Sequence, residues 1–390
     1  MSQQTTFRTN EGILYIDLID RIDASNASAV EGEIQSIRKE NEGLHTVLDA
    51  EKLTYISSAG LRVILRLRKE EPELAIINVS PEVYNILEMT GFTEMMTVKK
   101  AYRRLSVDGC EMIGKGANGA VYRYDAETIV KVYFNPDALP EIQRERELAR
   151  KALVLGINTA IPYDVVRVGE SYGTVMEMLE ASSLSKFIQK DPEHLEVPLK
   201  YYVDMLKQIH ETEVDSGMPD MKEVALGWAA FDRDHLPNEI GDKLYKMVED
   251  VPQRNTMLHG DYHTNNIMIR DGEALLIDMD TLCVGHPIFE LGSMFNAYAG
   301  FSEFDHKAVE SFLKIPYETA GKFWRKALAM YLDTDDEARV SEVENKAKIV
   351  GYMRLLRRTI RRNEPNREQL IEIYKEKLTK LVPTVDELTF

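Results

Sequence analysis

The chain has 390 residues, of which 44% are hydrophobic, and this length is enough for two or three ordinary domains. Its 65 acidic residues outnumber its 48 basic ones and give a net charge of −17, which argues against a nucleic-acid partner because phosphate contacts need clustered cations. Two cysteines provide no disulfide framework, no stretch approaches the roughly 20 apolar residues of a membrane span, and residues 1–6 lack signal-peptide character, so we expect a cytoplasmic location without membrane insertion.

Strands and helices are expected to alternate over residues 1–99. The strand-forming segments are residues 13–19, 46–49 and 74–79. The helical segments are residues 26–38, 60–69 and 81–90. Either Ser57 or Ser58 can cap the second helix, and Pro81 suits the first turn of the third. This alternation predicts a small α/β domain.

Residues 53–64 (LTYISSAGLRVI) and 86–92 (ILEMTGF) resemble the STAS domain of anti-sigma-factor antagonists. The resemblance implies a regulatory domain that binds a protein partner and is switched by phosphorylation of a serine, here Ser58. An exposed hydroxyl at a helix N-terminus can accept added negative charge. The regulated members usually carry Asp where this chain has Ser57, so simple helix capping remains the alternative for both serines.

Beyond a basic linker at residues 99–104, the segment 113–122 carries a G-x-G-x-x-G pattern. A dinucleotide-binding fingerprint requires a helix directly after its glycines, whereas here two strand-forming segments follow, at 121–124 and 129–133. The pattern therefore favours a β-hairpin that lies over phosphates. The candidate nucleotide-binding residues on it are Gly114, Lys115, Gly116, Gly119 and Val121.

The most informative stretch is residues 258–280, which predicts strand, polar loop, strand, turn and strand. Asp261 is followed by Asn266 after five residues and by Asp278 after seventeen. This order suits phosphoryl transfer, in which one carboxylate orients the attacking hydroxyl while an amide oxygen and a second carboxylate hold Mg²⁺. A plain hairpin with Asp and Asn in its turn is the alternative.

The pattern His259-Gly260-Asp261-x-His263-x-x-Asn266, followed by Asp278, resembles the Brenner motif of the aminoglycoside phosphotransferase and choline kinase families. These families are relatives of the protein kinases, and the similarity extends from about residue 105 to the C-terminus. The resemblance implies that Asp261 is the catalytic base and that Asn266 and Asp278 are the metal ligands. His259 is expected to orient the loop by hydrogen bonds.

The same resemblance implies an ATP site between two lobes. Lys131 is expected to contact the α- and β-phosphates and to pair with a helix glutamate, Glu147, with Glu145 as the alternative because the helix register cannot be read exactly. An edge-strand lysine that faces water is the other interpretation of Lys131. The hinge falls in residues 172–179, with Met176, Glu177 and Leu179 beside the adenine. The side chains do not distinguish ATP from GTP.

Only twelve residues separate Asp278 from Glu290, which leaves no room for a protein-kinase activation segment. A small-molecule acceptor is therefore expected. The family usually shows Gly-Asp-Pro followed by Asp-Leu, where this chain has His286 and Glu290, so the substrate preference of antibiotic-modifying relatives does not transfer. Glu290 is still expected to accept hydrogen bonds from the catalytic-loop backbone, and Asp280 is an additional candidate for metal binding.

A basic helix is expected near the C-terminus. Its apolar face comprises Ile349, Met353, Leu356 and Ile360. Residues 346–362 contain no acid, and their cations are Lys346, Lys348, Arg354, Arg357, Arg358, Arg361 and Arg362. A solvated basic face is the simpler interpretation, and recognition of an anionic group is the alternative.

These features predict an α/β STAS domain at residues 1–99 joined to an α+β two-lobed protein kinase-like domain, with lobes at 100–180 and 181–390. The predicted function is ATP- and Mg²⁺-dependent phosphorylation of a hydroxyl on a small molecule, with a protein partner at the STAS domain. The alternative is a regulatory protein of the anti-sigma-factor-antagonist type whose kinase-like domain senses nucleotide or phosphorylates Ser58.

Overall fold

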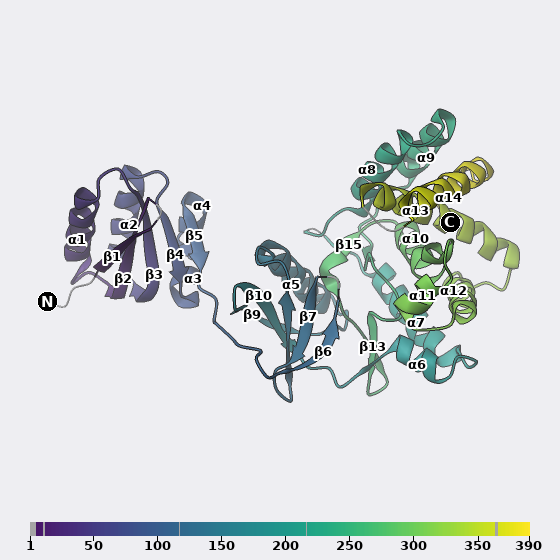
Figure 1. Ribbon diagram of the computed structural model, residues 1–390, viewed down its shortest axis with the longest axis horizontal. Helices are drawn as coiled ribbons and strands as arrows, with labels where there is room; N and C mark the ends of the chain where they lie inside the picture. The colour runs from purple at the N-terminus through teal and green to yellow at the C-terminus, as the bar shows by residue number, and fades with distance from the viewer. Residues whose placement is uncertain (1–4, 11, 117, 216, 363–365) are drawn as a thin grey trace. The chain divides into compact units, whose positions relative to one another are not determined.

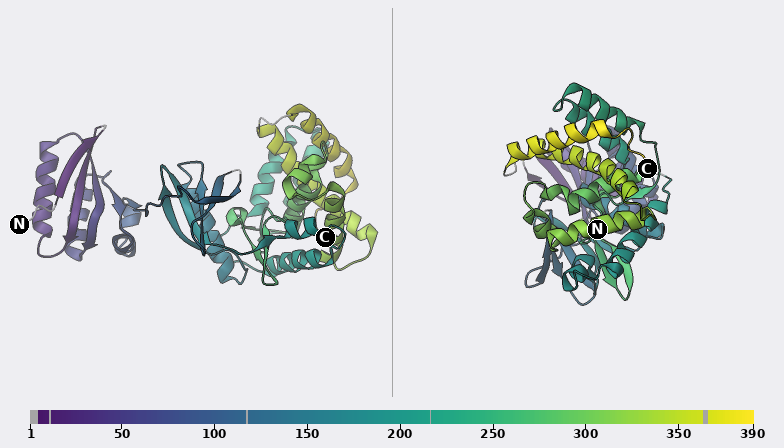
Figure 2. Two further views of the ribbon diagram at one scale, coloured as in Figure 1. Left: turned by 60° about the horizontal axis from the view of Figure 1, so that its bottom comes forward. Right: turned by 90° about the vertical axis from the view of Figure 1, so that its right-hand side faces the viewer.

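The computed structural model describes residues 5–10, 12–116, 118–215, 217–362 and 366–390. The chain forms two compact units, which are residues 1–106 with 165–170, and residues 107–164 with 171–390. Figures 1 and 2 show an N-terminal sheet with helices, and a second body in which a β-rich lobe precedes a mostly helical one.

The N-terminal unit is a five-stranded sheet in the order β1-β2-β3-β4-β5. β1 and β2 are antiparallel and the other neighbours are parallel. The strands are β1 (Thr5–Asn10), β2 (Ile13–Ile22), β3 (His45–Ile56), β4 (Ala75–Val79) and β5 (Thr97–Lys100). The helices are α1 (Ala27–Glu40), α2 (Ser58–Glu70), α3 (Pro81–Met89) and α4 (Phe92–Met95). The predicted α/β alternation is thus confirmed.

The strand predicted at residues 46–49 is much longer, because β3 continues to Ile56. Its second half alternates exposed polar residues with the buried Leu53 and Ile56, so the sequence there lacks the continuous apolar run of the first half. Parallel strands that are buried on both faces have continuous apolar runs, whereas a strand end with one solvent-exposed face does not.

The two serines at the start of α2 have different roles. Ser57 is the N-cap, and its hydroxyl accepts a hydrogen bond of 3.2 Å from the backbone N–H of Ala59. Ser58 is the first helical residue and is exposed. Gly60 lies so close to the sheet that a Cβ there would come 2.7 Å from Ile56 Cγ1. Close packing therefore explains the small residue at position 60, and exposure leaves Ser58 accessible.

The smaller lobe of the second unit is built on a sheet in the order β6-β7-β8-β10-β9. Its elements are β6 (Glu111–Lys115), β7 (Gly119–Arg123), β8 (Thr128–Tyr133), α5 (Leu139–Val154), β9 (Pro162–Val168) and β10 (Ser171–Glu177). β8 is hydrogen-bonded to β7 on one side and to β10 on the other. Lys131 therefore lies in an interior strand, which rules out the edge-strand interpretation.

The larger lobe is mostly helical. Its helices are α6 (Leu184–Lys190), α7 (Glu196–Glu211), α8 (Met221–Arg233), α9 (Asn238–Asp250), α10 (Pro287–Tyr298), α11 (Lys307–Leu313), α12 (Tyr317–Tyr331), α13 (Glu337–Arg361) and α14 (Arg367–Leu381). Its short strands are β11 (Ser182–Ser183), β12 (Met257–Leu258), β13 (Ile267–Arg270), β14 (Glu273–Leu276) and β15 (Cys283–Val284). Its 3-10 turns are η1 (Met279–Thr281), η2 (Gly300–Ser302) and η3 (Val382–Thr384).

Helix α10 is the centre of the larger lobe, since every residue from Pro287 to Tyr298 is buried. It packs against α12 and α13, and its length is apolar apart from a few polar side chains that serve the site described below. The apolar face predicted for α13 is confirmed, because Ile349, Met353 and Leu356 are fully buried. No helix among the described residues is both long enough and apolar enough to cross a membrane.

Candidate active site

The predicted catalytic loop joins β12 to β13. β12 pairs with β15 and β13 pairs with β14, so the loop leaves one short ribbon and enters another. Gly260 occupies the left-handed region with φ +81°, and a Cβ there would come 2.4 Å from the carbonyl oxygen of Thr281. Only glycine fits this position, which sets the direction of the chain into Asp261.

His259 orients the loop, as the sequence predicts. It is fully buried, and its Nε2–H donates to the carbonyl oxygen of Ile277 at 3.1 Å. With the proton on Nε2, Nδ1 is free to accept the backbone N–H of Asp261 at 3.4 Å. Burial lowers the pKa of His259, so the neutral imidazole that this arrangement needs is the stable form.

Glu290 holds the catalytic loop through its backbone, which confirms the prediction that this residue accepts hydrogen bonds from the loop. Its carboxylate accepts the backbone N–H of His259 and, at 3.0 Å, that of Gly260. Complete burial raises the pKa of Glu290 to about 7 although the two backbone donors oppose the shift. His286 plays a separate role at the start of α10, where its Nδ1 accepts the N–H of Ile288 at 3.2 Å.

Asp261 is ionised in this setting. Its Oδ2 lies 3.4 Å from Nε2 of His263. Partial burial alone would raise the pKa of the Asp261 carboxyl, but His263 and then Arg354 more than offset it and hold the pKa below its usual value. A carboxylate with these neighbours can accept a hydrogen bond from a hydroxyl and orient it for attack.

Asn266 is fixed by the same loop. Its side-chain Nδ2 donates to the backbone carbonyl of Asp261 at 3.0 Å. The side-chain oxygen of Asn266 points away from this bond and is available to a metal ion. Its own carbonyl accepts the N–H of Ile277 at 3.0 Å, so the loop and the strand that leads to Asp278 are tied together. An amide oxygen and a carboxylate are hard ligands of the kind that Mg²⁺ prefers.

Asp278 contacts the smaller lobe of the same unit through Lys131. Its backbone is left-handed, with φ 64° and ψ 62°, and its Oδ1 lies 3.3 Å from Nζ of Lys131. Burial would lower the pKa of Lys131, but the carboxylates of Glu145 and Asp278 raise it above its ordinary value. Lys131 is therefore a fixed cation between the two lobes of this unit.

The helix residue that pairs with Lys131 is Glu145, so the prediction of Glu147 was wrong. Glu145 Oε1 lies 2.8 Å from Lys131 Nζ, and its Oε2 accepts the hydroxyl of Tyr133 at 2.7 Å. Glu147 lies on the exposed side of α5. Residues two positions apart on a helix point in directions that differ by about 200° around the helix axis, so Glu145 and Glu147 lie on opposite faces.

The glycine pattern forms the predicted hairpin, since β6 and β7 are antiparallel and carry Gly114, Lys115, Gly119 and Val121. The N–H of Gly116 donates to the carbonyl oxygen of Gly119 at 2.9 Å and closes the turn, in which Ala117 lies outside the described residues. A Cβ on Gly119 would come 2.4 Å from the carbonyl oxygen of Val132. Gly119 is thus required by strand packing, whereas Lys115 and Gly116 are exposed.

At the expected hinge, β10 ends at Glu177, whose side chain pairs with Arg270 at 2.7 Å. Leu179 follows, and its carbonyl accepts the N–H of Ala181 at 2.8 Å. Met176 lines a small cavity that Glu145 and Asp278 also line. The structure thus brings Met176 beside the Lys131 ion pair, and Glu177 and Leu179 follow it in the connection between the lobes.

Asp280 lies one residue beyond Met279 in η1, near the same carboxylates. It lines a second cavity, of about 420 Å³, together with Lys131 and Glu145. Partial desolvation, with the carboxylates of Asp278 and Glu145 nearby, raises the pKa of Asp280 to about 7. At neutral pH, a smaller fraction of Asp280 than of Asp261 is therefore ionised.

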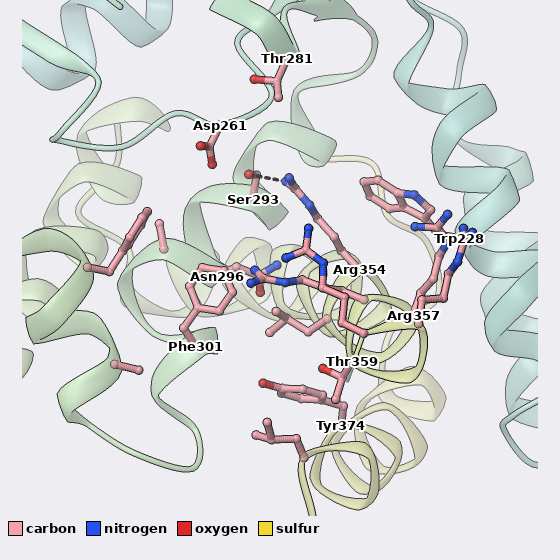
Figure 3. A pocket seen from close by; sticks show the side chains of 18 residues that line it. Trp228, Asp261, Thr281, Ser293, Asn296, Phe301, Arg354, Arg357, Thr359 and Tyr374 are labelled. Carbon is pink, nitrogen blue, oxygen red and sulfur yellow. Dashed lines mark hydrogen bonds between the residues drawn. The ribbon is translucent and has the colours of Figure 1, made fainter. Parts of the chain in front are cut away.

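A cavity of about 900 Å³ opens beside Asp261 (Figure 3). Its walls come from the helical lobe, and the side chains that line it include Trp228, Asp261, Thr281, Ser293, Asn296, Phe301, Phe312, Arg354, Arg357, Arg358, Arg361, Arg362 and Tyr374. Among the described residues that line it, Asp261 is the only acid and five are arginines. The cavity is of the size that encloses a metabolite.

Sequence reasoning missed several residues of this cavity. Arg354 belonged to the basic run but had no assigned partner, and its Nη1 donates to the carbonyl oxygen of Gly260 at 3.2 Å and to Ser293 Oγ at 2.6 Å. Ser293 gave no sequence signal, because it is one polar position in an apolar helix. Trp228 belongs to no motif of the sequence, and it is half-buried and lines the cavity.

Comparison with known proteins agrees with this geometry. The profile of the phosphotransferase enzyme family, APH, matches residues 109–325, and that of the STAS domain matches residues 4–105. The fold is that of a kinase-like phosphotransferase. The chain belongs to the phosphotransferase enzyme family and carries a STAS domain at its N-terminus.

Individual relatives resemble the two parts separately. A candidate anti-sigma factor antagonist, BtrV, of Bordetella bronchiseptica is 35% identical over 92 residues, which are 23% of this chain and 78% of BtrV. The anti-sigma F factor antagonist of Paenibacillus polymyxa is 26% identical over 102 residues, 25% of this chain and 87% of that protein. A thermostable variant of aminoglycoside phosphotransferase APH(4)-Ia, solved with ADP and hygromycin B, superposes with a TM-score of 0.50 at 10% identity, over 77% of this chain and 97% of that one. At this identity the likeness shows the fold alone.

Proposed function

We propose that the chain transfers the γ-phosphoryl group of ATP to a hydroxyl of a small molecule. The observation that carries this proposal is that Asp261, ionised and held by its loop, is the one acid among the described residues that line a cavity of about 900 Å³. A base must reach the hydroxyl that it activates, and this cavity offers an acceptor a place directly beside it. The solved relative APH(4)-Ia, a member of the same fold, holds ADP and an aminoglycoside.

In the proposed reaction the acceptor oxygen attacks the γ-phosphorus. A new P–O bond forms while the bond to the bridging oxygen breaks, and the electron pair leaves on ADP. The proton of the hydroxyl passes to the Asp261 carboxylate. Since phosphoryl transfer needs little covalent participation by the protein, positioning and charge supply most of the acceleration.

The smaller lobe supplies the nucleotide contacts in this proposal. The β6–β7 hairpin lies over the phosphates with exposed Lys115 and Gly116, and Lys131, positioned by Glu145, contacts the α- and β-phosphates. Met176, Glu177 and the N–H of Leu179 are the proposed neighbours of the adenine. The ion pair with Asp278 holds the Lys131 ammonium group in a fixed position, where the phosphates can contact it.

Two oxygens are the proposed metal ligands, the amide oxygen of Asn266 and the carboxylate of Asp278. Mg²⁺ usually takes one or two protein oxygens and completes its shell with phosphates and water, so this donor set fits it. Among the described residues, no group of three or more His, Cys, Asp or Glu could hold a metal. When bound, Mg²⁺ would neutralise charge on the phosphates.

A small acceptor is proposed over a protein acceptor. α10 begins at Pro287, nine residues after Asp278, and its start is buried, so no long segment lies across the entrance to receive a peptide. The complete set of Lys131, Asp261, Asn266 and Asp278 also favours catalysis over the alternative of a regulator that only senses nucleotide.

The test is transfer of label from γ-labelled ATP by the full chain to a panel of hydroxylated metabolites, with and without Mg²⁺. We expect one chemical class to become labelled only when Mg²⁺ is present. Wild-type and Lys131→Met proteins should differ by orders of magnitude, because the lysine contacts phosphate. Nucleotide binding without transfer to any compound would favour the regulator.

A further inference from the structure

Four arginines of α13 share one face of the helix. Arg354, Arg357, Arg358 and Arg361 follow the spacing i, i+3, i+4 and i+7, which places them above one another on one side. This face is the wall of the 900 Å³ cavity, and Arg362 joins it just after the helix ends. The basic run is therefore not simply a solvated face, since it is directed at the place where the acceptor is proposed to bind.

Two arginines of this wall, Arg357 and Arg361, have no carboxylate within 4 Å among the residues that the structure describes, whose ion pairs on α13 include those of Arg339, Lys346 and Lys348. Asp232 is near Arg357, but it is fully buried, and burial raises its pKa to about 8. Burial and then the like charge of Arg361 lower the pKa of Arg357, and Asp232 opposes this shift. Like charges held together in this way are stabilised by an anion placed between them.

Arg354 links the wall to the catalytic loop. Its guanidinium donates to the carbonyl oxygen of Gly260 and to Ser293, and it lies 5.6 Å from the ring centre of Trp228. Figure 3 shows this guanidinium between Ser293 and Trp228, on the side of the cavity where Asp261 lies. Arg354 would thus lie between an anion bound at Arg357 and Arg361 and the carboxylate of Asp261.

The rest of the lining suits an organic molecule. Trp228, Phe301, Phe312 and Tyr374 come from α8, η2, α11 and α14 and supply apolar and aromatic surface around the arginines. Guanidinium groups bind phosphate through paired, charge-assisted hydrogen bonds, and their planar form is suited to this. Although the protein carries a net charge of −17, the described residues that line this cavity include five arginines and one acid, so their local field favours anions.

We infer that the acceptor is a phosphorylated small molecule, whose phosphate is bound by Arg357 and Arg361 while a free hydroxyl meets Asp261. This inference rests on the proposed function and names its substrate class. A polycationic acceptor such as an aminoglycoside would place like charges against this wall. The chain therefore differs in acceptor charge from the relative that binds hygromycin B.

The first test compares acceptors matched in hydroxyl groups and differing in charge. The full chain is incubated with γ-labelled ATP and Mg²⁺, and with sugar phosphates, the corresponding neutral sugars, or aminoglycosides. We expect label in sugar phosphates or other phosphorylated hydroxy compounds. Equal or greater transfer to neutral or cationic compounds would overturn the inference while leaving the proposed function intact. Labelling of a phosphopeptide and of no small molecule would also overturn it.

Substitutions then identify the side chains. Arg357→Gln and Arg361→Gln should raise KM for the phosphorylated acceptor about tenfold or more each, since each removes a charge-assisted contact. The matched control is Arg339→Gln, on the same helix but paired with Glu342 and outside the cavity. KM for ATP should stay unchanged in all three variants. An unchanged acceptor KM in both cavity variants would contradict the assignment.

A binding measurement separates this inference from the reaction. Trp228 is one of two tryptophans, and the other, Trp324, is buried and donates to Glu344 at 3.0 Å. With the nucleotide site saturated by ADP, pyrophosphate should change tryptophan fluorescence in the wild type and not in the Arg357→Gln/Arg361→Gln double variant. This result without any phosphoryl transfer would reject the proposed function and keep the anion site. No fluorescence change in the wild type would reject the site.

Discussion

The guanidinium of Arg354 donates a hydrogen bond of 3.2 Å to the carbonyl oxygen of Gly260, the residue before Asp261. A helix that starts 76 residues after Asp261 in the sequence thus holds the backbone on which the proposed base depends. Ser293 strengthens the contact, since its hydroxyl donates to the same carbonyl at 3.0 Å and lies 2.6 Å from the Arg354 guanidinium. The loop is fixed by the large lobe and not by its own turn alone.

The first prediction concerns this contact. Arg354→Lys retains the charge but loses the planar fork that reaches Gly260 and Ser293 together, so kcat should fall about tenfold. KM for ATP should change little, because Arg354 lies in the acceptor cavity. The measurement is steady-state transfer with Arg339→Lys, on the same helix, as the control. Wild-type kcat in Arg354→Lys would mean that the loop does not need this support.

The second prediction separates two glutamates of α5. Glu145→Gln weakens the ion pair that positions Lys131, so KM for ATP should rise about tenfold, as expected for loss of a partly buried charged hydrogen bond. Glu147→Gln makes the same chemical change on the exposed side of the same helix and should have no effect. Nucleotide affinities of the two variants, measured by calorimetry, provide the comparison. Equal losses, or a larger loss at position 147, would contradict the pairing.

The third prediction concerns the proposed metal ligand. Asp278→Ala should remove the enhancement of ATP binding by Mg²⁺, because a metal that bridges the phosphates loses its charged protein ligand. Asp280→Ala is the control, two residues along the same turn, and should retain most of the enhancement. Calorimetry of ATP with and without Mg²⁺ tests both variants. If only Asp280→Ala loses the enhancement, the metal ligand is Asp280.

The fourth prediction concerns the start of α2. Ser57→Ala should destabilise the first turn of this helix by about 1 kcal/mol, because the N-cap hydrogen bond to Ala59 is lost. Ser58→Ala should change it by less than about 0.5 kcal/mol, as for an exposed residue without a specific contact. Hydrogen exchange of the first-turn amides in the full chain measures both. A larger effect at Ser58 would show that Ser58 carries the cap.

This separation leaves Ser58 free for the regulatory role proposed for it. A phosphate there would meet the backbone N–H groups of the first turn, and its charge would act on a docking partner. Label mapping after incubation of the full chain with γ-labelled ATP tests whether the kinase lobe itself modifies Ser58. Absence of label, together with wild-type kinetics and partner binding for Ser58→Glu, would leave Ser58 with no function beyond its place in the helix.

Local patterns predicted much of this fold. Alternating strands and helices predicted the small N-terminal α/β domain, and residues between 258 and 280 predicted the ribbon and loop of the site. These signals work because strand and helix periodicities and turn residues are local properties. The residue that positions Lys131 was assigned to Glu147 because helix register cannot be read to within two residues when both candidates are glutamates.

The cavity could not be predicted in the same way. Trp228, Ser293, Arg357 and Tyr374 lie on four different helices, and no pattern in the sequence links them. Large apolar residues usually lie in a core, yet Trp228 and Phe231 are only half-buried, since α8 turns this part of its surface to the cavity and to solvent. Which face of α13 meets solvent likewise depends on how the helices pack.

The most direct test of the account is Asp261→Asn in the full chain. Transfer should fall by about 10²-fold or more, because the base that accepts the hydroxyl proton is lost. The affinity for ATP should stay within about twofold, because the base acts on the acceptor and not on the nucleotide. Asp271→Asn makes the same change in an exposed turn and should be neutral. Transfer by Asp261→Asn within a fewfold of the wild-type rate would contradict the assignment of Asp261 as the base.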